Sequence, residues 1–396
     1  MRSNTLFAMM LVIISFTARA TAHDDNQTAE YKLTDDLSYK NFFSGFDFFH
    51  GPDPTNGFVQ FQDLPSSIDQ GLIGYLEDTQ SVFLGVDYVN KDPKGRASVR
   101  LGSKKGWDRG LLIADIRHMP ASICGSWNAF WLLGSDPKTG KMDQWPKFGE
   151  VDIVEGTNDY DSNSVTLHTS KGCVVDNGTS GNMGQAGNNN LGASFTGSLA
   201  SDDCDVNADG RGKNVGCSIH APKTMSNAQM GAESSSKTAT PLPSYGTGFN
   251  AAGGGVYATE WTSTSISVWF IPRSSPLYTT HFANMTVPEP SKWGTPMAHF
   301  SGSGCDFDAH FLNLKIIFDT TFCGEWAEKE WDKSCAKKTG VATCEAYVRD
   351  NPDVFKEAFW EVAGLKLYQK DSADHHAKWR DDGAEFVKVK GRFQRV

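Results

Sequence analysis

Short β-rich or alternating runs of residues, separated by turn residues, dominate the chain. Turn signals such as Asp92-Pro93-Lys94-Gly95 recur between the runs, and helical spacing of apolar residues is scarce. Many short strands with frequent turns are typical of an all-β sandwich. The predicted strands cover residues 81–88, 98–101, 110–116, 151–154, 164–168, 256–261, 265–271 and 311–319.

The segment 178–255 is rich in Gly, Ser, Asn and Ala and is too long for a hairpin loop. Cys204 and Cys217 lie inside it, so we expect a long surface excursion pinned by disulfides. A linker between two domains is the alternative. The strand pattern that resumes at Val256 favours the excursion.

One helical stretch is predicted late in the chain. Residues 344–349 and 352–358 have helical spacing, with Asp350-Asn351-Pro352 as a start signal. Residues 359–368 follow as a predicted terminal strand. Because the composition then becomes charged, we assign residues 371–396 to a tail outside the fold.

Both ends of the chain predict secretion. Arg2 precedes the apolar run 6–16, which is short for a membrane span, and small residues follow it. We therefore predict a signal peptide over residues 1–22, with a membrane anchor as the alternative. The carboxyl end is not apolar, so we expect no GPI anchor.

The cysteines and sequons agree with secretion. The eight cysteines contain no C-x-x-C pair, so up to four disulfides are expected and structural zinc is not. Sequons for N-glycosylation begin at Asn26, Asn177 and Asn284.

The segment Gly149-Glu150-Val151-Asp152-Ile153-Val154-Glu155-Gly156 carries the candidate chemistry. Retaining hydrolysis of a glycosidic bond needs two carboxyl groups about 5 Å apart. Strict strand alternation places Glu150, Asp152 and Val154 on one face and leaves Glu155 on the other. A β-bulge at Ile153 and Val154 would return Glu155 to that face and turn both apolar residues to the core, so we predict a bulge there.

Three acidic groups on one face crowd each other and raise the pKa of at least one. One group can then hold a proton near neutral pH, as a catalytic acid must. The E-x-D-x-x-E pattern alone is also compatible with a solvated strand face. Three tryptophans before it and Thr166-Leu167-His168-Thr169 after it favour a functional site.

The chain resembles the fungal laminarinases of glycoside hydrolase family 16 from about residue 38 to 369. The strings that carry the resemblance are CGSWNAFW (124–131), WP (145–146), GEVDIVEG (149–156), LHTS (167–170) and FDTTFCG (318–324). The resemblance implies a concanavalin-like β-jelly-roll of two curved antiparallel sheets, with a glucan chain in a cleft on the concave face. It assigns residues 23–370 to a catalytic domain. The loop 137–144 and Lys147-Phe148 depart from the usual pattern of the family.

The resemblance also implies roles for individual residues. Glu150 would be the nucleophile, Asp152 the assisting acid and Glu155 the acid/base, with His168 contacting these acids. Candidates for substrate binding, by stacking on sugar rings or contacting hydroxyls, are Trp127, Trp131, Trp145, Trp261, Arg100 and Asn158. Some of the tryptophans must fill the core instead.

The predicted function is a secreted endo-β-glucanase acting on β-1,3 and mixed β-1,3/1,4 glucan with retention. A transglycosylase that remodels wall glucan and a non-catalytic glucan-binding lectin on the same fold are the alternatives. The net charge of −10 argues against a nucleic-acid partner, and a neutral polymer suits it. We expect a monomer without a membrane span.

No cofactor is required for this chemistry, although the resemblance to the family allows a structural calcium ion. We predict no metal ligands, because the spacing in Asp374-His375-His376 is poor and a solvated tail explains it. The G-x-G-x-x-A match at 246–251 lies in a Gly-rich loop without a βαβ unit, so we do not predict a dinucleotide site.

Overall fold

The computed structural model describes residues 30–176, 195–226, 239–284 and 286–370. The predicted signal peptide, the charged tail and the sequons at Asn26 and Asn177 lie outside these residues. Asn284 is exposed. No helix in the described ranges is long and apolar enough to cross a membrane.

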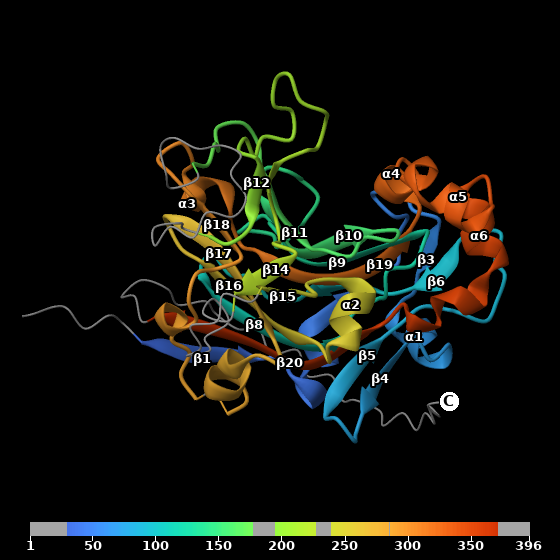
Figure 1. Ribbon diagram of the computed structural model, residues 1–396, viewed down its shortest axis with the longest axis horizontal. Helices are drawn as coiled ribbons and strands as arrows, with labels where there is room; N and C mark the ends of the chain where they lie inside the picture. Colours follow the sequence, from blue (N-terminus) through green and yellow to red (C-terminus); the bar gives the residue numbers. More distant parts are fainter. Residues whose placement is uncertain (1–29, 177–194, 227–238, 285, 371–396) are drawn as a thin grey trace, which may run out of the picture.

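Two eight-stranded antiparallel sheets pack face to face and confirm the all-β sandwich (Figure 1). The back sheet contains β18 (Ala298–Ser301), β17 (Ser265–Pro272), β16 (Gly255–Trp261), β8 (Gly110–His118), β20 (Trp360–Lys370), β5 (Ser81–Leu84) and β4 (Ile73–Leu76), with β1 (Tyr31–Asp36) paired to β20. The front sheet contains β12 (Ser198–Ser201), β13 (Cys217–His220), β11 (Ser164–His168), β10 (Glu150–Thr157), β9 (Ser126–Leu133), β19 (Lys315–Phe322), β7 (Arg100–Ser103) and β2 (Phe46–Phe48).

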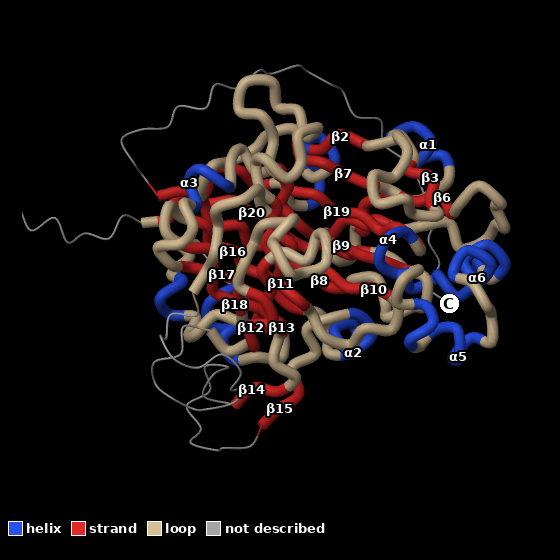
Figure 2. Tube along the Cα trace, turned by 90° about the horizontal axis from the view of Figure 1, so that it is seen from above, coloured by secondary structure: helices blue, strands red, loops and turns tan. Residues whose placement is uncertain are grey.

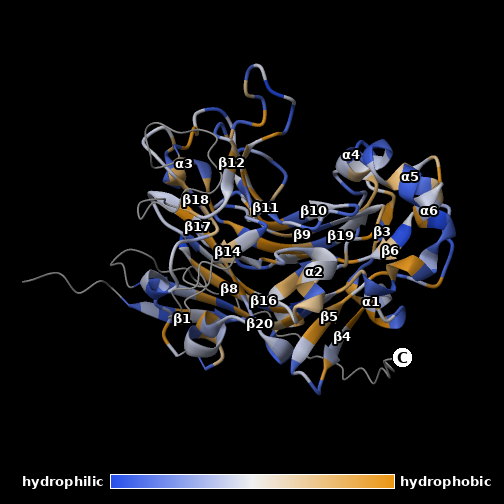
Figure 3. Cartoon of the chain, viewed as in Figure 1, coloured by the Kyte–Doolittle hydropathy of each residue, from blue (hydrophilic) through white to orange (hydrophobic). Residues whose placement is uncertain are grey.

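The main hydrophobic core lies between the two sheets, where apolar colour concentrates in Figure 3. Leu112 and Ala114 of β8 meet side chains such as Phe130 and Leu132 of β9 in one buried cluster. The remaining face of the front sheet is open, and the segments near β12 and α4 (Gly324–Ala327) stand on either side of it (Figure 1). This open face is where a site can form.

The central strands of the back sheet are buried on both faces. Leu111 and Ile113 of β8 point away from the main core into a second cluster with Leu277 and Trp293. The segment that carries these two residues includes a π-helical turn, Tyr278–Phe282, and the 3-10 turn Pro290–Lys292. Burial on both faces explains why β8 reads as a continuous apolar run, Leu-Leu-Ile-Ala.

The Gly-rich excursion contributes β12 and β13 to the front sheet. β13 pairs with β11 and β12 pairs with β13, so the interpretation as a linker between domains is wrong. The disulfide Cys204–Cys217 lies inside the excursion, as expected, and Cys173–Cys305 joins the segments on either side of it. Two smaller pairs complete the β-structure: β14 (Thr224–Ser226) with β15 (Ala239–Pro241), and β3 (Val59–Phe61) with β6 (Arg96–Ser98).

Short helices lie around the sandwich. They are α1 (Leu64–Asp69), α2 (Gly246–Ala251), α3 (Phe307–His310), α4, α5 (Cys335–Thr339) and α6 (Cys344–Asp350), together with the 3-10 turns Tyr39–Asn41, Phe43–Gly45, Trp331–Lys333 and Pro352–Glu357. Disulfide Cys124–Cys335 joins the start of α5 to the segment before β9, and Cys323–Cys344 joins the start of α6 to the end of β19.

The predicted late helix forms as α6, but the part from Pro352 onward is a 3-10 turn. Proline lacks the N–H that a continuing helix needs and restricts the residue before it. The predicted strand 98–101 is wrong as a single element, because β6 ends at Ser98 and β7 begins at Arg100. The strand predicted over 311–319 begins only at Lys315, since Phe311 directly follows α3.

Candidate active site

The strand β10 contains the predicted bulge. Asp152 pairs with Trp131 of β9, but the next pair is Val154 with Phe130, so Ile153 is the extra residue. Val151, Ile153 and Val154 are all fully buried in the main core. Glu150, Asp152 and Glu155 consequently share the open face of the front sheet.

Asn163 holds the bulge and was missed in the sequence. Its side-chain Oδ1 accepts a hydrogen bond from the backbone N–H of Glu155 at 2.9 Å, and its Nδ2 donates to the carbonyl of Ile153 at 2.8 Å. Asn163 is 1% exposed, so both bonds are shielded from water. A bulge leaves backbone N–H and C=O groups without hydrogen-bond partners on the neighbouring strand. Here the side-chain amide of Asn163 pairs with one group of each kind.

Two neighbouring strands supply polar contacts to the carboxyl groups. His168 of β11 pairs in register with Glu150, and its Nε2 lies 3.2 Å from Asp152 Oδ2. From β9, Trp127 Nε1 donates to Glu155 Oε1 at 2.9 Å. Asp152 is only 2% exposed, whereas Glu150 and Glu155 are partly exposed at the surface of the open face.

Burial and mutual repulsion raise the pKa of all three carboxyl groups. Desolvation and the charge of Asp152 raise the pKa of Glu155 to about 8, against a hydrogen bond from Trp127 that lowers it. The pKa of Glu150 is raised to about 8 by desolvation and by Asp152, while His168 and a hydrogen bond from Trp145 act to lower it. Desolvation, followed by the charge of Asp319, raises the pKa of Asp152 well above its usual value. The group therefore retains protons near neutral pH.

Asp319 is a fourth carboxylate on this face. Its Oδ1 accepts a hydrogen bond from Trp131 Nε1 at 3.1 Å, and its Oδ2 lies 3.5 Å from Arg100 Nη1. Across the sheet, Asp319 pairs with Ala129, which pairs with Glu155, so only a methyl side chain stands between the two carboxylates in that row. The sequence did contain a signal, since Asp319 is the only acidic residue inside the buried strand β19.

The structure separates the candidate tryptophans. Trp145 is 42% exposed, and its ring lies 6.4 Å from that of His168 between centroids, beside the carboxyl groups. Trp127 and Trp131 also lie on the open face, each tied through its N–H to a carboxylate. The prediction that Trp261 stacks on a sugar ring is wrong, because Trp261 is 2% exposed and packs in the core between the sheets.

Asn158 and Arg100, the two residues predicted to contact sugar hydroxyls, lie in different environments. The prediction that Asn158 contacts substrate hydroxyls is wrong, because Asn158 is 1% exposed. Its side chain accepts a hydrogen bond from the backbone N–H of Gly125 and donates one to the carbonyl of Ala327. Arg100 lies on the open face, with its guanidinium 5.0 Å from the ring centroid of Trp131. Its predicted contact with substrate stays a prediction.

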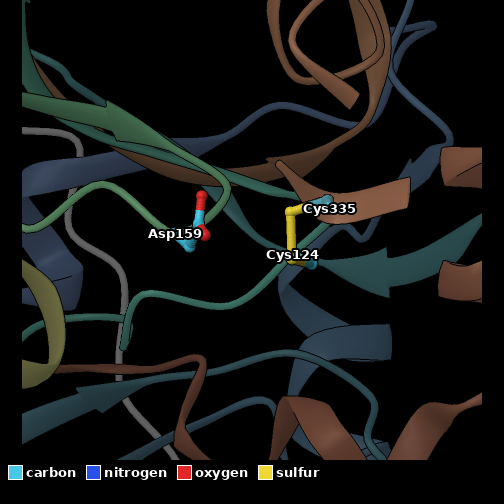
Figure 4. A group of neighbouring side chains, drawn as sticks. All are labelled: Cys124, Asp159 and Cys335. Carbon is cyan, nitrogen blue, oxygen red and sulfur yellow. A yellow bond between two sulfur atoms is a disulfide. The ribbon is translucent and has the colours of Figure 1, made fainter. Parts of the chain in front are cut away.

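Three groups of His, Cys, Asp and Glu in the described residues bring candidate metal-ligand atoms within 4.8 Å of one another. In two of them, Cys124 with Cys335 beside Asp159 (Figure 4) and Cys323 with Cys344 beside Glu328, the sulfurs are joined in disulfides. The third belongs to the candidate active site and consists of Glu150, Asp152 and His168. Calcium takes six to eight oxygen ligands, and none of these groups fits it.

Comparisons with known proteins show the family of this chain. A family model described as an XgeA-like catalytic GH16 domain matches residues 46–235 and 200–368. An endo-1,3(4)-beta-glucanase of Arthroderma benhamiae is 40% identical over 349 residues, covering 87% of this chain and 66% of that protein. Endo-1,3(4)-beta-glucanase xgeA of Emericella nidulans is 38% identical over 86% of this chain and 48% of its own length. The chain thus spans between about half and two thirds of the length of these curated relatives.

Two solved structures cover 86% of this chain and all of their own, each with a TM-score of 0.68. One is an elongating GH family 16 beta-1,3-glucosyltransferase at 39% identity. The other is laminarinase 16A of Phanerochaete chrysosporium at 34% identity, with beta-glucans (6-O-glucosyl-laminaritriose) in both donor and acceptor sites. Fold, site geometry and family model agree that this chain belongs to glycoside hydrolase family 16, in its XgeA-like group.

Proposed function

We propose that this protein is a secreted endo-β-glucanase that hydrolyses β-1,3 and mixed β-1,3/1,4 glucan with retention of anomeric configuration. The observation that carries the proposal is the bulged strand β10, which presents Glu150, Asp152 and Glu155 together on an open face with His168 beside them. The names of the relatives from Arthroderma benhamiae and Emericella nidulans support the substrate class.

In the first step of the proposed mechanism, Glu150 attacks the anomeric carbon while Glu155 gives its proton to the leaving glycosidic oxygen. The glycosidic bond breaks and a covalent glycosyl–enzyme forms. In the second step, Glu155 takes a proton from water, the water oxygen attacks the anomeric carbon, and Glu150 leaves as a carboxylate. The raised pKa of Glu155 suits a group that must begin the cycle protonated, whereas Glu150, whose pKa is also about 8, must lose its proton before it attacks.

Asp152 and His168 act on the two glutamates in this proposal. Asp152 lies between them on the strand, and its raised pKa lets it keep a proton and donate a hydrogen bond to Glu150. His168 Nε2, at 3.2 Å from Asp152, fixes the orientation of that carboxyl group. Glu150 is the nucleophile of the first step, and Glu155 gives a proton in the first step and takes one from water in the second. The proposed mechanism therefore uses no metal or cofactor, and we propose a secreted monomer that acts without nucleic acid.

Glucosyl transfer is the second candidate function. The solved glucosyltransferase at 39% identity favours it, because transfer uses the same covalent intermediate and differs only in the acceptor. A sugar hydroxyl then takes the place of water in the second step. A non-catalytic lectin is disfavoured, since glucan binding needs no cluster of buried acids.

The test is to incubate the purified protein with laminarin and with mixed-linkage glucan and to follow reducing ends and the anomer of the first product. New reducing ends with an initial β-anomer support retaining hydrolysis. Reshuffled chain lengths without net reducing ends would instead show the transferase, and an initial α-anomer would refute retention. Glu150→Gln should abolish turnover while remaining folded, whereas the matched change Glu345→Gln, at an exposed position of α6, should leave turnover intact.

A further inference from the structure

A pocket of about 300 Å³ lies at the far edge of the front sheet, away from the carboxyl groups. We call it the edge pocket; it is lined by Asp47, Phe49, Gly102, Met142 and Lys315, among others. Figure 2 shows β2 and β7 at this edge, with β19, β9 and β10 following. Four steps of about 4.8 Å separate β2 from β10, or about 19 Å along the sheet.

Strand register places the edge pocket on the same face as the carboxyl groups. Lys315 pairs with Leu133, which pairs with Glu150, so these three residues form one row across the sheet. Gly102 pairs with both Ile317 and Asp47 in the next row. The pocket therefore continues the open face that carries the acids.

Lys315 is the unusual residue of the edge pocket. It is 9% exposed, yet its ammonium has no hydrogen bond or ion pair with any of the residues that the structure describes. Partial desolvation of this ammonium at the wall of the pocket lowers the pKa of Lys315. Asp47 also lines the pocket, and the charge of its exposed carboxylate favours the charged ammonium.

The other walls are apolar and preformed. Phe49 and Met142 line the pocket, and the absent side chain at Gly102 leaves the space, since a Cβ there would lie 3.3 Å from Ile317 and 3.4 Å from Met142. Met142 comes from the loop that departs from the family pattern. That loop is closed by backbone hydrogen bonds from Asp136 to the carbonyl of Lys141 at 2.8 Å and from Gly140 to the carbonyl of Asp136 at 2.7 Å.

We propose that the edge pocket binds a glucosyl residue of the glucan chain, several units away from the bond that is cleaved. A neutral hexose presents an apolar ring face, which suits Phe49 and Met142, and hydroxyl groups, which can accept from the ammonium of Lys315 and donate to the carboxylate of Asp47. The volume is at the lower end for small-molecule sites and suits one sugar ring. An anionic ligand is disfavoured by Asp47 and by the net charge of −10.

This inference rests on the proposed glucanase function, and its test separates the two. The kcat/KM of the wild type, Lys315→Met and Gly102→Val is measured on a ladder of β-1,3-linked gluco-oligosaccharides of increasing length. Lys315→Met should lose about tenfold in kcat/KM, the worth of a hydrogen bond to a charged group, on oligosaccharides that reach the pocket. Gly102→Val, whose side chain would fill the pocket, should also lose kcat/KM on these oligosaccharides. Both should retain wild-type values on the shortest substrates, which also shows that they fold. Lys356→Met, at an exposed position, is the matched control and should change nothing.

An equal loss at every length, or no loss on the longest substrates, would overturn the assignment of the edge pocket. If the wild type cleaves none of these oligosaccharides, the proposed function fails, and the pocket is tested by calorimetric binding of the longest one to Glu150→Gln. Weaker binding when Lys315→Met is added would support the pocket, while equal binding or none would overturn it.

Discussion

The charge of Asp319 should contribute to the alkaline limit of activity by raising the pKa of Glu155. The two carboxylates share a row of the front sheet, with Ala129 between them. Burial raises the pKa of Asp319 to about 6, so it is ionised when Glu155, with a pKa of about 8, loses its proton. An ionised Asp319 raises the pKa of Glu155, and Asp319→Asn removes that charge while keeping an oxygen that can accept from Trp131 Nε1.

The size of the effect follows from the register. Two inter-strand steps of about 4.8 Å place the carboxylates about 9.6 Å apart. At an effective dielectric constant of about 20, their repulsion is about 1.7 kcal/mol, which is about one pKa unit once water above the open face is allowed for. The other groups that act on Glu155 are Asp152, Trp127 and His168, and all three are retained in the variant.

The assay is the pH profile of kcat on laminarin. Activity falls at alkaline pH when Glu155 loses the proton that it gives to the leaving oxygen, so Asp319→Asn should move this limb about one unit toward lower pH. Asp308→Asn, which removes an exposed carboxylate on α3, is the control and should leave the limb in place. An unchanged limb in Asp319→Asn, or a shift to higher pH, would refute the coupling between Asp319 and Glu155.

Three further changes test other parts of the site. Asn163→Ala leaves the N–H of Glu155 and the carbonyl of Ile153 unpaired, so it should lower the free energy of unfolding by about 2–4 kcal/mol and reduce kcat; wild-type kcat would show that the bulge does not depend on Asn163. Trp145→Ala removes an exposed ring beside the carboxyl groups and should raise KM about tenfold in steady-state kinetics, with little change in denaturant unfolding. Trp261→Ala should do the opposite, costing about 3–5 kcal/mol of stability with KM unchanged, and a raised KM would contradict its place in the core.

Local pattern was enough for the fold class and for the carboxylate strand. Alternation along a strand has a period of two, so the sequence alone shows that Glu155 is out of phase with Glu150 and that a bulge is required. The buried side chains of Ile153 and Val154 confirm this inference. Local pattern also located β11, because Ser164–His168 is bounded as predicted.

Tertiary structure alone decided which residues meet. Trp127, Trp131 and Trp261 were all candidates for stacking on sugar rings. Trp127 and Trp131 lie on the open face of the front sheet, but Trp261 faces the core from the back sheet. Burial of a tryptophan depends on the sheet that packs against it, which no local window contains.

Asn163 and Asp319 show the same limit more sharply. Each becomes important because distant parts of the chain pair beside β10: Asn163 reaches back to the bulge, and Asp319 arrives on β19 through its pairing with β9. The disulfide Cys124–Cys335 likewise joins residues 211 positions apart. The sequence determined which strand carries the acids and that it must bulge, because strand geometry is local. The groups that hold the bulge and set the charge around it were decided by pairings between strands far apart in the chain, because hydrogen bonds and charges act through space.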